Sequence, residues 1–233
     1  MRFALSFLLL ATAPAVAAER GVTVTDFDRL RVDGGFTVEV RSGAAAAARI
    51  IGSQAAIEAT SVSVQGRQLT IRRNRSPWGG YPGQTPPAAT VRVTVPGLSA
   101  VWVSGPAKVS VDRMKGLRLA ASLEGPGSLA IGNVTADRMD VGAVGAGTVS
   151  LGGTVANLTA ILRGAGTLDA AQLMVADLKL TSETAGNVTV GVRRAANVTM
   201  TGTGSVVVLG TPACTVRNIG SGTVACGSDQ AQR

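Results

Sequence analysis

A short glycine-centred phrase returns seven times between Val103 and Cys226, and this repeat constrains the fold more than any other feature of the chain. The first position of the phrase falls at residues 105, 125, 145, 164, 184, 202 and 220, so the steps are 20, 20, 19, 20, 18 and 18 residues. Five of the seven phrases read Gly-x-Gly. A regular period of this length indicates stacked coils, because each repeat buries its apolar face only against its neighbours.

Apolar residues alternate with small or polar residues between successive phrases. Val109 and Val111 follow the first phrase at a spacing of two, and Leu158, Ala160 and Leu162 show the same spacing later in the chain. This period is typical of strands with one buried face. We therefore expect an all-β fold, a parallel β-helix or β-solenoid with coils of about 20 residues. Each coil should contain two or more short strands joined by glycine corners, with almost no helix.

The spacing also predicts which residues stack on one another. Residues one coil apart should lie in register, about 4.8 Å apart. Two series with a spacing of 20 residues are Ala136, Ala156, Ala176 and Ala196, and the residues that follow them, Asp137, Asn157, Asp177 and Asn197. We expect the segment from 136 to 196 to be the most regular part of the stack.

The chain divides into four parts by composition. Residues 1–18 read as a leader, 19–97 as a less regular β section, 98–227 as the solenoid and 228–233 as a tail. Within the β section, residues 72–87 contain four prolines and three glycines. This composition excludes a regular element and predicts an exposed loop.

Residues 1–18 have the features of a secretory signal peptide. Arg2 gives the segment one positive charge, an apolar run follows, and small residues at Ala15, Ala17 and Ala18 provide a cleavage point. The segment is too short for a good membrane span. We therefore expect a protein exported to the periplasm or the cell exterior, with no transmembrane segment in the mature chain and no nucleic-acid partner.

Cys214 and Cys226 are the two cysteines of the chain, and both lie in the last predicted coil. In an oxidising compartment such a pair forms a disulfide, and the bond would close a coil that has a neighbour on one side only. The spacing is not Cys-x-x-Cys, and the chain contains no histidine. We therefore expect no metal centre, and no feature of the sequence requires a cofactor.

Arginine and lysine outnumber the acids, and the chain has a net charge of +8. A positive surface attracts acidic partners, such as an anionic glycan or another component of the cell envelope. A basic surface that serves only solubility fits the same composition. Both interpretations stay open at this point.

The loop at 72–87 brings cations and aromatic rings together. The candidate ligand-binding residues are Arg72, Arg73, Arg75, Trp78 and Tyr81. Aromatic faces stack on sugars, and arginine pairs with carboxylate or phosphate, so these residue types suit an anionic ligand. In the alternative interpretation the loop folds back over the solenoid, with Trp78 and Tyr81 as its apolar anchors.

Acidic residues are the candidates for catalysis, since a Ser/His/Asp set requires the histidine that the chain lacks. Enzymes built on β-helices align acids across neighbouring coils. The acids in question are Asp137, Asp140, Asp169, Asp177 and Glu183. Asp and Asn at a repeated corner are, however, typical turn residues that hydrogen-bond to the local backbone. We therefore expect no catalytic site.

Four phrases of the chain resemble a known family. They are Phe27–Val40, the Val64–Ile71 hairpin, the Val93–Leu98 strand exit and the first repeat, Ser104–Val109. Together they resemble the auto-transporter adhesin head domain, the GIN domain family of exported bacterial proteins, over roughly Phe27 to Val208. The resemblance implies a right-handed parallel β-helix with an adhesin-like role, and it supplies no catalytic residues. Many relatives are lipid-anchored, whereas this chain lacks the acceptor cysteine.

The leading hypothesis is an exported, non-enzymatic β-solenoid that acts by surface contact, as an adhesin-like or cell-envelope binding module. Two alternatives stay open. One is a polysaccharide-active enzyme on a β-helix, and the other is a structural envelope protein that assembles into oligomers.

Overall fold

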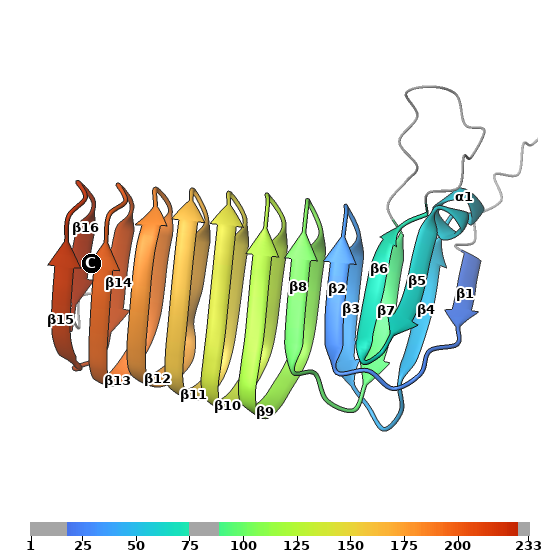
Figure 1. Ribbon diagram of the computed structural model, residues 1–233, viewed down its shortest axis with the longest axis horizontal. Helices are drawn as coiled ribbons and strands as arrows, with labels where there is room; N and C mark the ends of the chain where they lie inside the picture. The colour runs from blue at the N-terminus through green and yellow to red at the C-terminus, as the bar shows by residue number, and fades with distance from the viewer. Residues whose placement is uncertain (1–17, 75–88, 228–233) are drawn as a thin grey trace, which may run out of the picture.

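The computed structural model describes residues 18–74 and 89–227 as an elongated stack of β-coils (Figure 1). The sixteen strands in these ranges belong to one sheet that winds around the stack. The elements in chain order are β1 (Ala18–Val22), β2 (Arg29–Asp33), β3 (Thr37–Ser42), β4 (Ala47–Gly52), α1 (Gln54–Glu58), β5 (Thr60–Gln65), β6 (Gln68–Arg73), β7 (Thr90–Val95), β8 (Ala100–Ser104), β9 (Lys108–Glu124), β10 (Ser128–Gly145), β11 (Thr148–Gly164), β12 (Thr167–Thr184), β13 (Asn187–Met200), β14 (Ser205–Leu209), β15 (Ala213–Asn218) and β16 (Thr223–Cys226). The all-β solenoid expected from the repeat is confirmed. The predicted leader, apart from Ala18, and the predicted tail lie outside these ranges.

From β9 to β13 each strand runs through most of one coil. β10, for example, has 18 residues and pairs in parallel with β9 on one side and β11 on the other. This differs from the short strands that the sequence suggests. The corner at residues 132–137 keeps an extended backbone, whereas the strands end at the glycine phrase. The leading glycines at 105, 125, 145 and 164 have a positive φ there.

The glycine phrase forms a tight corner at which the backbones of neighbouring coils touch. Gly125 and Gly145 lead two successive corners with φ values of +102° and +107°, a region that is open mainly to glycine. The third position of the phrase is constrained by close approach instead. A Cβ added at Gly127 would lie 2.6 Å from the carbonyl oxygens of Gly105 and Ala107. The corners led by Gly125 and Gly145 therefore require glycine at two positions for two different reasons.

One corner has threonine in the leading position. Thr184 is buried, and its hydroxyl donates to the carbonyl oxygen of Gly166 at 3.0 Å and accepts from the N–H of Gly186 at 3.0 Å. The side chain thus bonds to its own corner and to the corner of the preceding coil. Thr184 has no positive φ, so a residue other than glycine fits this corner, and the two bonds satisfy its buried hydroxyl.

The core consists of aliphatic side chains between the two broad faces of the stack. One column runs in register through six coils and consists of Val109, Leu129, Val149, Leu168, Val188 and Val206. None of the six is more than 3% exposed. The prediction that one face of the alternating runs is buried is confirmed for this column, whereas Leu117 and Val216, which belong to other alternating runs, are exposed.

The N-terminal strands join the same stack, but their order in space differs from their order in the chain. β2 lies between β6 and β8, and β3 lies between β7 and β9, always with parallel pairing. The coil made by β6 and β7 therefore lies outside the coil made by β2 and β3. Beyond it, β5 pairs antiparallel with β6 in the predicted hairpin, and β4 and β1 extend the other face, also antiparallel. These strands close the N-terminal end (Figure 1).

The predicted stacking of individual residues holds only in part. Asn157 does lie opposite Asp177, but Arg138, rather than Asp137, lies opposite Asn157. Likewise, Ala136 lies opposite Val155 instead of Ala156. The reason is that the corners differ in length, so the register shifts between β10 and β11, between β11 and β12, and twice between β12 and β13.

The most regular step of the stack is the one between β9 and β10. Every pair of residues in register between these two strands is 20 positions apart in the sequence, without a register shift. The expectation that the segment from 136 to 196 is the most regular is therefore wrong, because that segment contains all the corners of changing length.

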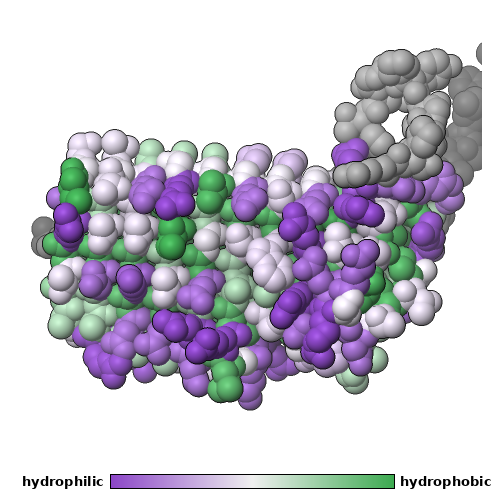
Figure 2. Space-filling model, viewed as in Figure 1, coloured by the Kyte–Doolittle hydropathy of each residue, from purple (hydrophilic) through white to green (hydrophobic). Residues whose placement is uncertain are grey.

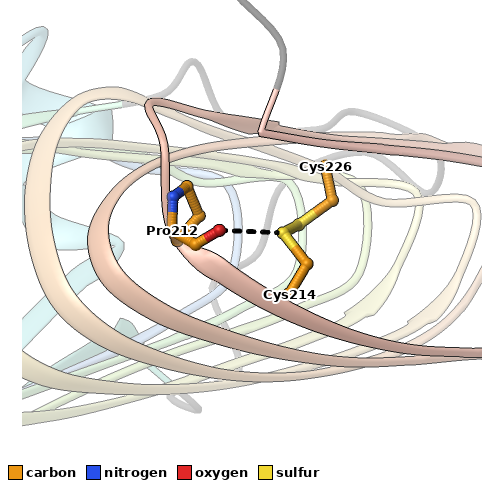
Figure 3. Close-up of a disulfide and its surroundings, with 3 residues drawn as sticks. All are labelled: Pro212, Cys214 and Cys226. Carbon is orange, nitrogen blue, oxygen red and sulfur yellow. Dashed lines mark hydrogen bonds between the residues drawn. A yellow bond between two sulfur atoms is a disulfide. The ribbon is translucent and has the colours of Figure 1, made fainter.

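The Cys214–Cys226 disulfide expected from the sequence closes the last coil (Figure 3). Cys214 in β15 lies in register with Ala196, and Cys226 in β16 lies in register with Val208; both partners are buried. The cysteines therefore continue two core columns, and the bond joins the two faces across the end of the core. β15 is exposed along its whole length, so the disulfide holds a strand that has little packing of its own.

Gly127→Ala should lower the free energy of unfolding by about 1–3 kcal/mol, because the added methyl group is forced against two carbonyl oxygens of the preceding coil. Gly97→Ala is the matched control, since a Cβ there meets nothing within 4 Å. The control should change stability by less than about 0.5 kcal/mol. Denaturant unfolding followed by circular dichroism measures both values. Equal effects would contradict the role given to the corner.

Replacing both cysteines, Cys214→Ser with Cys226→Ser, should loosen the last coil and leave the middle of the stack intact. Loss of a cross-link over 12 residues costs about 2–3 kcal/mol. Amide hydrogen exchange should become faster in β15 and β16, with unchanged protection in β10 and β11. Exchange that rises equally in all coils would show that the bond acts on the stack as a whole.

Candidate functional site

The loop residues proposed from the sequence are only partly placed by the structure. Arg72 and Arg73 are the last residues of β6, both are exposed, and neither forms an ion pair within the described ranges. Arg75, Trp78 and Tyr81 lie outside the described residues. A ligand-binding role for this loop therefore stays a prediction. A clear concave surface lies elsewhere, on the stack itself.

A groove of about 580 Å³ runs along the edge opposite the glycine corners. It is lined by Lys115, Gly116, Leu117, Thr135, Ala136, Asp137, Thr154, Val155, Ala156, Met174, Ala176 and Arg193. These residues come from the second corners of β9 to β13. Because neighbouring coils are about 4.8 Å apart, the four coils from β9 to β12 extend over about 14 Å. The groove therefore has the shape of a site for an extended ligand.

The floor of the groove lies between two rows of outward side chains. Gly116, Ala136 and Val155 lie in register and form the floor. One wall is the register row of Lys115, Thr135, Thr154 and Met174. Ala136 and Val155 turn their side chains into the core, with exposures of 9% and 1%, and Gly116 has no side chain. The floor therefore consists largely of backbone, and the groove results from outward side chains on either side of it.

Two large apolar side chains at the groove are exposed to solvent. Leu117 is 75% exposed and Met174 is 40% exposed. Of the large apolar residues within the described ranges, Leu117 has the highest exposure. Apolar surface of this kind gains free energy when a ligand or partner removes it from water. The lining of the groove is mainly apolar, so its ligand should be apolar along most of its length.

Cations surround this apolar surface. Lys115 and Arg193 line the groove, and Arg118 and Arg138 line a second hollow, of about 460 Å³, that shares Leu117 and the acid Asp137 with it. None of these four cations forms an ion pair with another described residue. Figure 2 shows hydrophilic side chains gathered along this lower edge of the face in view. The edge therefore combines an apolar groove with unpaired positive charge.

The candidate catalytic acids do not converge on a common site. Asp177 accepts hydrogen bonds from Arg194, whose Nε lies 2.8 Å from Oδ1, and this guanidinium lowers the pKa of the Asp177 carboxyl. Glu183 pairs with Arg163 at 3.0 Å. A general acid requires a raised pKa, so Asp177 is poorly suited to that role.

Other corner residues bond to the backbone, as the turn interpretation predicts. The Asn157 side-chain amide donates to the carbonyl oxygen of Asp137 at 3.1 Å. Asp169 Oδ1 accepts from the N–H of Ala171 at 3.3 Å. Two of the polar corner residues therefore serve the local fold.

Within residues 18–74 and 89–227, no group of three or more His, Cys, Asp or Glu side chains is placed to hold a metal ion. No helix in the same part of the chain has both the length and the hydropathy needed to cross a membrane.

The sequence does contain a signal for the groove that the repeat obscures. Leu117 stands between Gly116 and Arg118, in a run that is otherwise polar or small. It is exposed, whereas Leu119, two residues later, is buried. Leu117 can be recognised as exposed only when the position of the second corner is known, because the chain changes there which residues point inward.

Comparison with known proteins relates nearly the whole chain to one fold. A family model described as putative auto-transporter adhesin, head GIN domain, matches residues 26–212. A putative adhesin from Bacteroides fragilis NCTC 9343 is similar with a TM-score of 0.80 and 19% identity, over 91% of this chain and 97% of that chain. No curated protein gives a match.

Two further solved structures, both from Parabacteroides, share the architecture. A putative lipid binding protein from Parabacteroides distasonis ATCC 8503 has a TM-score of 0.69 and 16% identity, over 92% of this chain and 98% of that chain. A putative adhesin from Parabacteroides merdae ATCC 43184 has a TM-score of 0.65 and 16% identity, over the same shares of 92% and 98%. At these identities the solved structures establish the fold alone.

Arg194→Ala should raise the pKa of the Asp177 carboxyl toward its ordinary value, because the hydrogen-bonded cation that favours the carboxylate is removed. Arg193→Ala is the matched control, since it removes the neighbouring arginine, which does not pair with Asp177. Side-chain carboxyl shifts followed by NMR through a pH titration measure the change. An unaltered Asp177 pKa in Arg194→Ala would contradict the assignment.

Proposed function

Because the chain belongs to the family described as putative auto-transporter adhesin, head GIN domain, we propose that it is a non-enzymatic, adhesin-like binding module of the cell envelope. The family match covers residues 26–212, which include every strand from β2 to β14. The match therefore applies to the stack that carries the groove.

The groove is the observation that supports a specific ligand. Its volume of about 580 Å³ falls within the range of roughly 300–1,000 Å³ typical of small-molecule sites. An acyl chain fits its apolar, extended lining. An anionic head group fits the unpaired cations, either at Arg118 and Arg138 or at Lys115 and Arg193. The proposed ligand is accordingly an anionic amphiphile of the envelope.

Two further observations are consistent with this ligand. One solved structure of the same fold is described as a putative lipid binding protein. The net charge of the chain is +8, which favours approach to anionic surfaces.

The absence of enzymatic activity is part of the proposal. The acids at the corners are separately engaged, with Asp177 bound to Arg194 and Glu183 bound to Arg163. A polysaccharide-active enzyme would need two free carboxyl groups facing one cleft, and Asp137 is the one acid in the lining of the groove.

Export from the cytoplasm is proposed from the leader at residues 1–18 and from the disulfide. The Cys214–Cys226 bond is typical of oxidising compartments. A location in the periplasm or on the cell exterior would bring the groove into contact with envelope amphiphiles.

Leu117→Ser should weaken the binding of dodecyl phosphate by about tenfold, because a leucine side chain covered by the ligand contributes about 1.5–3 kcal/mol. Isothermal titration calorimetry below the micelle concentration measures the affinity. The matched control is Ile219→Ser, since Ile219 is 61% exposed and lies outside the groove. Equal losses in both variants, or no binding to the unaltered protein, would overturn the proposal.

The role of the cations is tested by comparing the affinities of an anionic and a neutral ligand with the same alkyl chain length. Dodecyl phosphate should bind more tightly than dodecyl maltoside. The double substitution Arg118→Gln with Arg138→Gln should abolish this preference if the head group lies in the second hollow. The control double variant, Lys108→Gln with Arg217→Gln, removes the same amount of charge elsewhere and should keep the preference for dodecyl phosphate. Preference unchanged in the first double variant would place the head group at Lys115 and Arg193.

A further inference from the structure

A second charged surface lies on a broad face of the stack, where the antiparallel cap meets the parallel coils. Arg49 of β4 and Arg92 of β7 stand directly opposite one another in an antiparallel pair. Residues in this position are about 4.5–5.5 Å apart, so like charges repel. Two cationic residues therefore stand side by side on the outer surface of this strand pair.

Each of these arginines pairs with an acid on its far side. Arg49 Nη1 lies 2.9 Å from Glu19 Oε1, and Arg92 Nε lies 3.0 Å from Glu39 Oε2. Each pair uses one donor atom of a guanidinium group that has five N–H donors. Most of the donors of both arginines therefore have no acceptor within the described ranges.

Arg41 brings a third cation to the same place. It lies two residues after Glu39 in β3, in register with Thr94, and it forms no ion pair with any residue of 18–74 or 89–227. A hollow of about 440 Å³ is lined by Glu19, Glu39, Arg41, Ala47, Arg49, Arg92, Val93 and Thr94. Three cations and two acids leave this arginine hollow with one net positive charge.

We propose that the arginine hollow binds an oxyanion carried by an acidic glycan, either a carboxylate or a sulfate or phosphate ester. An oxyanion beside Arg41, Arg49 and Arg92 would accept hydrogen bonds from their unused donors. It would also relieve the repulsion between the two opposed guanidinium groups. The inference is independent of the groove, which lies on another surface and shares none of these residues.

The surroundings of the arginine hollow favour a sugar chain over a lipid. The lining is mostly polar, and polar side chains continue from it along the same face. One register row consists of Thr90, Thr37, Lys108, Ser128 and Thr148. Hydroxyl groups donate to and accept from sugar hydroxyls, whereas an acyl chain would find little apolar surface there.

Arg41→Gln should weaken the binding of an acidic polysaccharide by about tenfold at constant ionic strength. The probes are heparin, which carries sulfate groups, and polygalacturonate, which carries carboxylates, so the pair identifies the anion. Arg217→Gln is the matched control, because it removes an exposed, unpaired arginine from β15; it should weaken binding by less than about twofold. Surface plasmon resonance with the disulfide-intact protein measures the affinities.

Glu39→Gln provides a test in the opposite direction. It releases Arg92 from its acid and should strengthen polysaccharide binding by about two- to fivefold. Dodecyl phosphate binding should be the same in Arg41→Gln as in the unaltered protein, so failure of the groove and failure of the hollow are distinguishable. Circular dichroism melts verify that all variants fold.

Three results would overturn the proposal. One is no binding of either polysaccharide, and another is an equal loss in Arg41→Gln and Arg217→Gln, which would indicate attraction by net charge alone. The third is binding of inorganic phosphate or polyglutamate with the affinity of the polysaccharides and the same loss in Arg41→Gln. That result would show that the hollow recognises the anion without the sugar chain.

Discussion

Direct contact between the backbones of stacked glycine corners determines the geometry on which the other features depend. A side chain at Gly127 or its equivalents would meet carbonyl oxygens of the preceding coil. With no side chain there, neighbouring coils approach to the normal spacing of paired strands, and the core columns align from coil to coil. The corners that carry this constraint have little room for larger side chains.

The groove and its cations lie at the opposite edge of the stack. The second corner differs from coil to coil, since residues 132–137 of β10 are extended whereas Gly153 of β11 has a φ of +116°. The register also shifts there, as between Ile131 and Val134. The arginine hollow lies at the other place where the repeat is interrupted, at the antiparallel cap.

The repeat period and the alternation of apolar residues were sufficient to predict the solenoid and the buried face, because both depend on neighbours close in the chain or one period away. The disulfide was predictable because the chain has two cysteines, both in its last coil. The position of β6 and β7 outside β2 was not predictable in this way. Arg29 pairs with Gln68 and with Ala100, and no period marks these contacts. The groove was missed for a related reason, since Lys115 and Met174 come together only through corners of unequal length.

The two ends of the stack are closed by different means, with antiparallel strands at one end and a disulfide at the other. Neither closure involves the coils from β9 to β12. Whole coils can therefore be added or lost in this interval during evolution without rebuilding either end. Each added coil would lengthen the groove by about 4.8 Å. Relatives with more coils would therefore bind longer ligands through the same kinds of residue at the second corner.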